Sequence, residues 1–188
     1  CPASTGESSM IRIARLAPLF CALFLMAPAA GHAKKPADQF KGQIILSEKP
    51  FPASFRSDAT FISHMKKVNT KSFRLGEEGK VDVEFMAFFA RPYKVTEFTA
   101  KVYEITDGVR PQVIYSFPIN PNPGQGGQRI LASYTTLRRD TFDDERDRKY
   151  RMVISVGYQG RAIAKTDFVI KARPMEKAAA GPSVVEFK

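Results

Sequence analysis

Cysteine, histidine and tryptophan are scarce in this sequence, which has two cysteines, two histidines and no tryptophan. Both cysteines, Cys1 and Cys21, and one histidine, His32, precede Lys34, where we expect the mature protein to begin. The mature chain would then hold no disulfide, no cysteine nucleophile and no thiolate metal site. A zinc site would need carboxylates for its other ligands, and a serine–histidine–aspartate site would depend on His64 alone.

Recognisable phosphate-binding and cofactor motifs are also missing. The glycine-rich segment 120–128 (Asn-Pro-Asn-Pro-Gly-Gln-Gly-Gly-Gln) has no following Lys-Ser/Thr pair. It also lies between expected strands, whereas a phosphate loop precedes a helix. We interpret it as a long loop of the kind that often carries binding residues. We therefore expect no cofactor, no metal and no enzymatic activity.

The region 10–33 has the organisation of a secretory signal peptide. Such a peptide has a basic start, a short apolar run and a cleavage triplet of small residues. Here these parts are Arg12 with Arg15, the run 16–30, and Gly31-His32-Ala33. We expect cleavage after Ala33, export by the general secretory route, and a periplasmic or secreted protein.

A membrane anchor is the alternative interpretation of the apolar run 16–30. The run is shorter than the roughly 20 residues that a bilayer crossing needs, and it is interrupted by Pro18 and Pro28. We therefore expect no transmembrane segment after cleavage. Residues 1–9 are interpreted as an upstream extension or a cloning remnant and are set aside.

The mature chain would have the size of one domain and a basic surface. Residues 34–188 number 155 and carry 27 basic and 18 acidic side chains, a formal charge of +9. A surplus of positive charge favours anionic partners such as nucleic acid, acidic glycans or lipid headgroups. Nucleic acid is the least accessible of these three to an exported protein. We expect a flexible leader at 34–41, a domain at 42–173 and a disordered tail at 174–188.

Apolar periodicity predicts one short helix and about seven strands. Phe61, Ile62 and Met65 fall at helical spacing after Ser57-Asp58, which is an N-cap signal. The clearest strand pattern begins at Lys80, with alternate residues directed to the core. The expected strands are 43–47, 80–90, 96–106, 112–119, 129–137, 150–156 and 161–172.

These elements predict an all-β fold, namely an antiparallel two-sheet sandwich with one short helix. Asp107-Gly108 is a turn dipeptide, so 96–106 and 112–119 should form a hairpin. Tyr158-Gln159-Gly160 should form the turn of a second hairpin. An up-and-down antiparallel barrel is the alternative.

The C-terminal quarter resembles known immunoglobulin-like sandwiches. Asp147-Arg-Lys-Tyr150 is similar to their tyrosine corner, in which a tyrosine opens the penultimate strand. Ala164-Lys-Thr-Asp-Phe168-Val-Ile is similar to the last strand of bacterial immunoglobulin-like modules. The resemblance implies an immunoglobulin-like architecture, without the tryptophan and cysteine pair of antibody domains.

The densest charge lies in the loop 138–149. Its carboxylates at 140–147 are hard oxygen ligands that suit calcium. The spacing is not that of a twelve-residue calcium loop, and arginines and a lysine are interspersed with the acids. A solvated loop of mixed charge is therefore the main interpretation, with calcium binding as the alternative.

Three functions are compatible with these features. The first, which we favour, is a non-catalytic binding or assembly module of the bacterial envelope that contacts a protein partner through loops or a sheet edge. The second binds acidic glycan or lipid headgroups through basic and exposed aromatic residues, among them Tyr93, Tyr115 and Tyr158. The third is a hydrolase built on carboxylates such as Asp82 and Glu84, which share one strand face.

Candidate interaction residues come from the two long loops, because binding residues are concentrated in loops on rigid scaffolds. They are Asn120, Asn122, Gln125, Gln128, Arg138, Arg139, Arg146 and Arg148. His64 is interpreted as a partly exposed residue on the flank of the helix, because no partner motif accompanies it.

Overall fold

Eight β-strands and two short helices form the part of the chain that the structure describes. The structure is a computed structural model and describes residues 34–106, 108, 110–121 and 127–174. The expected signal peptide at 10–33, its cleavage site at Ala33, residues 1–9 and the tail beyond residue 174 lie outside these ranges. The elements are α1 (Pro36–Gln39), β1 (Ile44–Ser47), α2 (Asp58–Val68), β2 (Ser72–Phe73), β3 (Lys80–Phe88), β4 (Phe98–Glu104), β5 (Gln112–Ile119), β6 (Ile130–Arg138), β7 (Arg148–Val156) and β8 (Ala162–Ile170).

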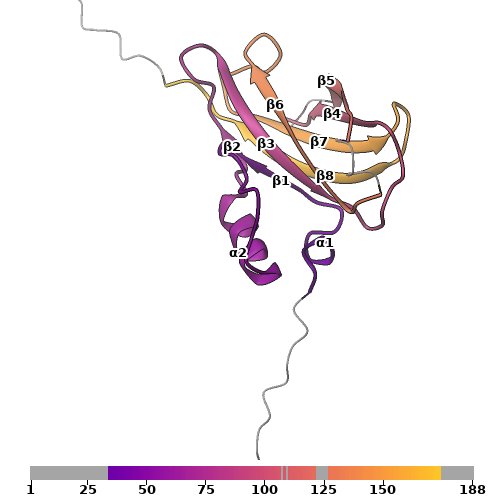
Figure 1. The fold of residues 1–188 in the computed structure, drawn as a ribbon. Helices are drawn as coiled ribbons and strands as arrows, with labels where there is room; N and C mark the ends of the chain where they lie inside the picture. The colour runs from indigo at the N-terminus through magenta and orange to yellow at the C-terminus, as the bar shows by residue number, and fades with distance from the viewer. Residues whose placement is uncertain (1–33, 107, 109, 122–126, 175–188) are drawn as a thin grey trace, which may run out of the picture. The chain divides into compact units, whose positions relative to one another are not determined.

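The strands form a three-stranded sheet, β1-β3-β6, and a five-stranded sheet, β2-β8-β7-β4-β5. The sheets face each other across an apolar core (Figure 1). On one side a single bridge pairs Gln43 with Lys165 and links the sheets. On the other side β5 and β6 end their sheets without pairing. The prediction of an all-β sandwich is confirmed, and the barrel alternative is wrong for the described strands because the sheets do not close.

The alternation predicted for 80–90 is confirmed in β3. Val83, Phe85 and Ala87 lie between the sheets and are buried. Met86 and Phe88, on the other face, are also buried because a second apolar cluster covers that end of the strand. Apolar residues on both faces of a strand therefore correspond here to two separate packing layers.

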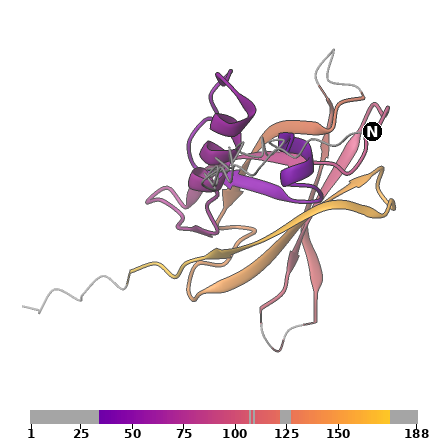
Figure 2. The same cartoon turned by 90° about the horizontal axis from the view of Figure 1, so that it is seen from below.

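The second cluster lies between the outer face of the three-stranded sheet and the helices (Figures 1 and 2). Met65 of α2 is buried in it together with Ile45 of β1. Ser57 caps α2, since its hydroxyl accepts a hydrogen bond from the Thr60 amide over 3.2 Å. The predicted helix and its cap are confirmed.

Two short elements differ from the sequence expectation. The flexible leader expected at 34–41 needs correction, because α1 forms there and Phe40 is buried against Phe88, with ring centroids 5.0 Å apart. The sheets are also not wholly antiparallel, since β2 pairs with β8 in parallel. At two residues β2 is too short to show a periodic pattern.

Both expected hairpins are present. β5 returns antiparallel to β4, and β8 returns antiparallel to β7, so the five-stranded sheet contains both. Neither α1 nor α2, the helices of the described part, has the length and apolar character of a membrane span.

Candidate cleft between strands β5 and β6

A cleft of about 600 Å³ opens between β5 and β6, on the side where the two sheets are not linked. It exists because a three-stranded sheet faces a five-stranded sheet, so that the inner face of the last strand, β5, is incompletely covered. The lining residues are Tyr115, Phe117, Pro118, Ile119, Asn120, Ser133, Tyr134, Thr135, Thr136, Arg138, Asp140, Thr141 and Phe142.

Aromatic rings form the wall of the cleft on the β5 side. Tyr115 and Phe117 are half-buried, and their ring centroids are 5.2 Å apart. The ring of Phe117 packs against the core ring of Phe85, with centroids 6.2 Å apart, and the ring of Tyr115 packs against Phe142, with centroids 6.1 Å apart. The wall is therefore continuous with the core and held in place by it.

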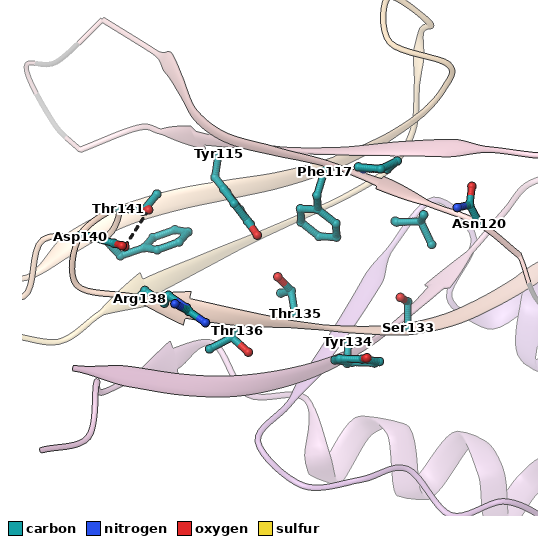
Figure 3. Close-up of a pocket in the computed structure, with 13 residues that line it drawn as sticks. Tyr115, Phe117, Asn120, Ser133, Tyr134, Thr135, Thr136, Arg138, Asp140 and Thr141 are labelled. Carbon is teal, nitrogen blue, oxygen red and sulfur yellow. Dashed lines mark hydrogen bonds between the residues drawn. The ribbon is translucent and has the colours of Figure 1, made fainter. Parts of the chain in front are cut away.

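Hydroxyl groups line the β6 side. Figure 3 shows Ser133 and Thr135 directed from β6 towards Tyr115 and Phe117, with Tyr134 on the opposite side of the strand. Ser133 and Thr135 occupy inward positions between the buried residues Leu131 and Leu137. The inner face of β6 is thus apolar at its ends and polar in its middle, where the cleft lies.

Arg138 and Asp140 lie at the end of the cleft next to the charged loop. Arg138 is exposed, and Asp140 accepts a hydrogen bond from the Thr141 hydroxyl over 3.0 Å. The cleft therefore combines an aromatic wall, a hydroxyl-lined strand and one charge of each sign. Such a surface suits a ligand with both apolar and hydrogen-bonding groups.

The carboxylates of the neighbouring loop pair with separate cations. Asp144 is buried and bonds to Arg139 over 3.1 Å, whereas Asp147 accepts from Lys171 over 2.6 Å. Arg148 bridges Asp143 and Glu104, with 2.5 Å to each. Within the described residues no group of three or more metal-binding side chains is close enough to hold an ion. These pairs brace the loop and leave the calcium alternative without support.

Tyr150 connects this loop to the core. Its side chain is buried, and its ring lies 5.2 Å from Phe142 and 5.6 Å from Phe168 between centroids. Burial raises the pKa of the Tyr150 phenol to about 12, against the opposing effect of a hydrogen bond with the Asp143 backbone. The hydroxyl therefore stays neutral at physiological pH and ties the loop to β7.

The candidate residues chosen from the sequence are placed in different surroundings. Asn120 and Arg138 line the cleft. Arg139 and Arg148 are held in the ion pairs of the charged loop, and Arg146 and Gln128 are exposed. Asn122 and Gln125 lie outside the described residues.

The residues of the hydrolase alternative lie outside the cleft, on the outer face of the three-stranded sheet. Asp82 accepts from the Thr136 hydroxyl over 2.6 Å, and Glu84 accepts from the Phe51 amide over 2.8 Å. They share a face, as expected, but each holds a separate neighbour. The His64 ring packs on the Phe55 ring, with centroids 5.3 Å apart, on the helix side of the same sheet.

Sequence reasoning did not select Phe117, Ser133 or Thr135, which form the middle of the cleft. A signal was present, since serine and threonine interrupt an inward-facing set in β6 whose other members are Leu131 and Leu137. Of the three aromatics expected to be exposed, Tyr158 is so, whereas Tyr93 and Tyr115 are half-buried.

The comparisons with known proteins identify no family. No family model matches the sequence, and no curated protein matches it. Chicken MD-1, solved in complex with lipid IVa, is similar over 50% of this chain and 72% of its own, with 16% identity and a TM-score of 0.33. A β-glucosidase from Listeria innocua, solved with glucose, is similar over 55% of this chain and 15% of its own, with 11% identity and a TM-score of 0.32. At this level of similarity the immunoglobulin-like resemblance is not confirmed, and neither structure indicates a function for this chain.

Proposed function

We propose that the protein is an exported, non-catalytic binding module that takes up an extended polypeptide segment beside β6. The observation that carries the proposal is the unpaired edge of β6 next to the cleft. Peptide binding by strand addition uses backbone hydrogen bonds for affinity and pockets for alternate side chains for specificity. Both parts are available at this edge.

The flanking hydrogen bonds show which backbone groups of β6 are free. Phe89 donates to Arg129 and Arg139 donates to Gly79, so the odd-numbered residues of β6 bond to β3. Directly opposite residues alternate between bonded and non-bonded pairs in an antiparallel ladder. The amides and carbonyls of Ala132, Tyr134 and Thr136 therefore face away from β3, and β6 has no second strand neighbour in the described chain.

The edge of β5 is less suited to strand addition. Ile105 donates to Lys149 of the β7 side, so odd-numbered residues of β4 bond to β7. Pro118 lies opposite Thr99, and its nitrogen consequently faces the free edge of β5. Proline there has no hydrogen to donate, which is a common way to block an edge. β6 contains no proline, so it is the receptive edge of the pair.

An added strand would extend the three-stranded sheet over the uncovered part of β5. Its side chains would alternate between the cleft and the outer face, where Tyr134 is 76% exposed. Those in the cleft would meet Tyr115 and Phe117. We expect a partner segment with apolar side chains at every second position.

The immunoglobulin-like form of the sandwich is part of the proposal. It is supported by the buried Tyr150 in the first part of β7, and by the three-stranded and five-stranded sheets packed face to face. Export is supported by the signal-peptide pattern at 10–33. The polyanion alternative is weakened by Arg139 and Arg148, whose charges are used in ion pairs.

Tyr134→Pro tests the proposal, because it removes a free-edge amide without breaking a bond to β3. Heptapeptides are selected from a random library against the protein. A selected peptide should bind the wild type and lose at least tenfold in affinity for Tyr134→Pro, since one main-chain bond and the close approach of the strand are lost. Tyr134→Ser, which keeps the amide, is the matched control and should bind within about threefold of the wild type.

Hydrogen exchange supplies the decisive measurement. Bound peptide should newly protect the amides of Ala132, Tyr134 and Thr136. Circular dichroism and a urea midpoint close to wild type establish that Tyr134→Pro is folded. Equal peptide affinity of Tyr134→Pro and Tyr134→Ser would show that β6 is not the receptor edge. Protection of amides confined to another strand would show the same.

A further inference from the structure

A second cleft, of about 570 Å³, lies at one end of the sandwich, where β3 and β7 finish and β8 begins. Its lining is mainly apolar and includes Tyr93, Val156 and Ile163. Arg91 and Arg161 are its charged lining residues, and no carboxylate lines it. The cleft is separate from the edge of β6 and takes no part in the function proposed above.

The apolar wall is held in position by the core. The Tyr93 ring lies 5.6 Å from Phe89 and 6.5 Å from Phe98 between centroids, edge-on to both. Phe89 and Phe98 are themselves buried and stacked at 5.1 Å. A ligand entering the cleft would therefore meet a preformed aromatic surface, which lowers the entropy lost on binding.

Both guanidinium groups have unused hydrogen-bonding capacity. Arg91 lies over the Tyr93 ring, 5.3 Å from its centroid, a contact that leaves the N–H groups available. Arg161 is exposed and has no ion pair with a described carboxylate. Arginine binds carboxylate and phosphate oxygens in a bidentate manner. The cleft thus places two anion-binding groups at the rim of an apolar surface.

We propose that this cleft binds a small amphiphilic anion, whose carboxylate or phosphate contacts Arg91 and Arg161 and whose apolar part lies against Tyr93, Val156 and Ile163. The two arginines call for a negatively charged head group, and the apolar lining calls for an apolar chain on the same ligand. A free amphiphile and an anionic lipid in a bilayer share this chemistry. We commit to the free amphiphile, because the site is a cleft rather than a protruding apolar surface.

The test titrates the isotope-labelled protein with four probes while amide shifts are followed. Octanoate carries both groups, octylamine has the opposite charge, and acetate and inorganic phosphate lack the chain. Octanoate should shift the amides around Arg91, Val156 and Ile163 and bind at least tenfold more tightly than the other three, because only it satisfies both parts of the site.

The double variant Arg91→Gln/Arg161→Gln should lose about tenfold or more of the octanoate affinity. The matched control Arg56→Gln/Arg110→Gln removes two exposed arginines elsewhere and should bind octanoate like the wild type. An unchanged amide spectrum away from the cleft shows that both variants are folded.

Three results would overturn the proposal. Equal binding of octylamine would reduce the cleft to an apolar surface, and equal binding of acetate or phosphate would reduce it to a charge effect. The third result combines two observations: octanoate fails to bind, and the wild type but not the double variant binds vesicles of equal parts phosphatidylglycerol and phosphatidylcholine. The cleft would then be a contact site for a bilayer. Because the lining of this cleft includes no residue of β6, its amides are distinct from those of Ala132, Tyr134 and Thr136, and the two experiments have separate readouts.

Discussion

At the residue scale, Tyr150 joins the core to the charged loop. Replacing it by phenylalanine keeps the ring between Phe142 and Phe168 and removes the hydrogen bond with Asp143. We expect Tyr150→Phe to lower the free energy of unfolding by about 1 kcal/mol, the usual net value of one such bond. Urea unfolding measures the loss. Tyr134→Phe, at an exposed tyrosine, should stay within about 0.5 kcal/mol of wild type, and an equal loss in both would contradict the assignment.

Two paired carboxylates, Asp147 of the charged loop and Asp167 of β8, give stability a defined dependence on pH. The Ala172 amide and then Lys171 lower the pKa of Asp147, and Arg151 lowers the pKa of Asp167. A depressed folded-state pKa stabilises the fold above the unfolded value of about 3.9, and this stability is lost as the pH falls through the folded pKa. The urea midpoint of the wild type should therefore exceed that of Asp147→Asn/Asp167→Asn at pH 7, and the difference should shrink below about pH 4. A difference that is constant from pH 7 to pH 2 would contradict this.

At the element scale, the turn between β7 and β8 depends on two glycines for different reasons. A Cβ at Gly160 would lie 1.9 Å from the Val156 carbonyl oxygen, whereas Gly157 has a φ of +64° and open space around it. Gly157→Ala should lower the free energy of unfolding by about 1 kcal/mol, because alanine is less stable than glycine in the left-handed backbone conformation. Gly160→Ala should cost more, because backbone must move, and we expect about 2–4 kcal/mol. Thermal unfolding of both variants checks the order, and a milder effect at Gly160 would show that the turn relaxes freely.

The long elements were accessible from sequence because their patterns are local. Val83, Phe85 and Ala87 alternate with more polar residues, and Ser57 marks the start of α2. The short elements were not. Four residues of α1 and two of β2 are too few for a period to emerge, and both are held by tertiary contacts such as Phe40 on Phe88.

At the scale of the whole molecule, the described domain contains no cysteine, so no disulfide within it contributes to its stability. No cysteine follows Cys21 in the sequence, so the domain is held by its two apolar clusters. The thermal midpoint of the protein from Lys34 onward should be the same, within about 1 °C, with and without reductant, because no covalent cross-link constrains its unfolded state. A reductant-dependent midpoint in calorimetry would contradict this.

The cleft could not be predicted from sequence, because it is a property of two strands in different sheets. Tyr115 and Ser133 line one cleft only because a three-stranded sheet faces a five-stranded sheet. Local patterns predicted β5 and β6 as strands but not as edge strands, because only the order of the strands in the two sheets shows that β6 is an edge. The preference for loops as contact sites led instead to Arg139 and Arg148, which brace the charged loop.

The bridge between Gln43 and Lys165 joins the backbones of the two sheets on one side, whereas β5 and β6 of the described chain share no backbone bond on the other. The spacing of β5 and β6 is therefore set by side chains that pack across the core, such as Phe85 against Phe117, whose ring centroids lie 6.2 Å apart. The width of the cleft consequently depends on the volume of these side chains and not on the hydrogen-bond ladders of either sheet.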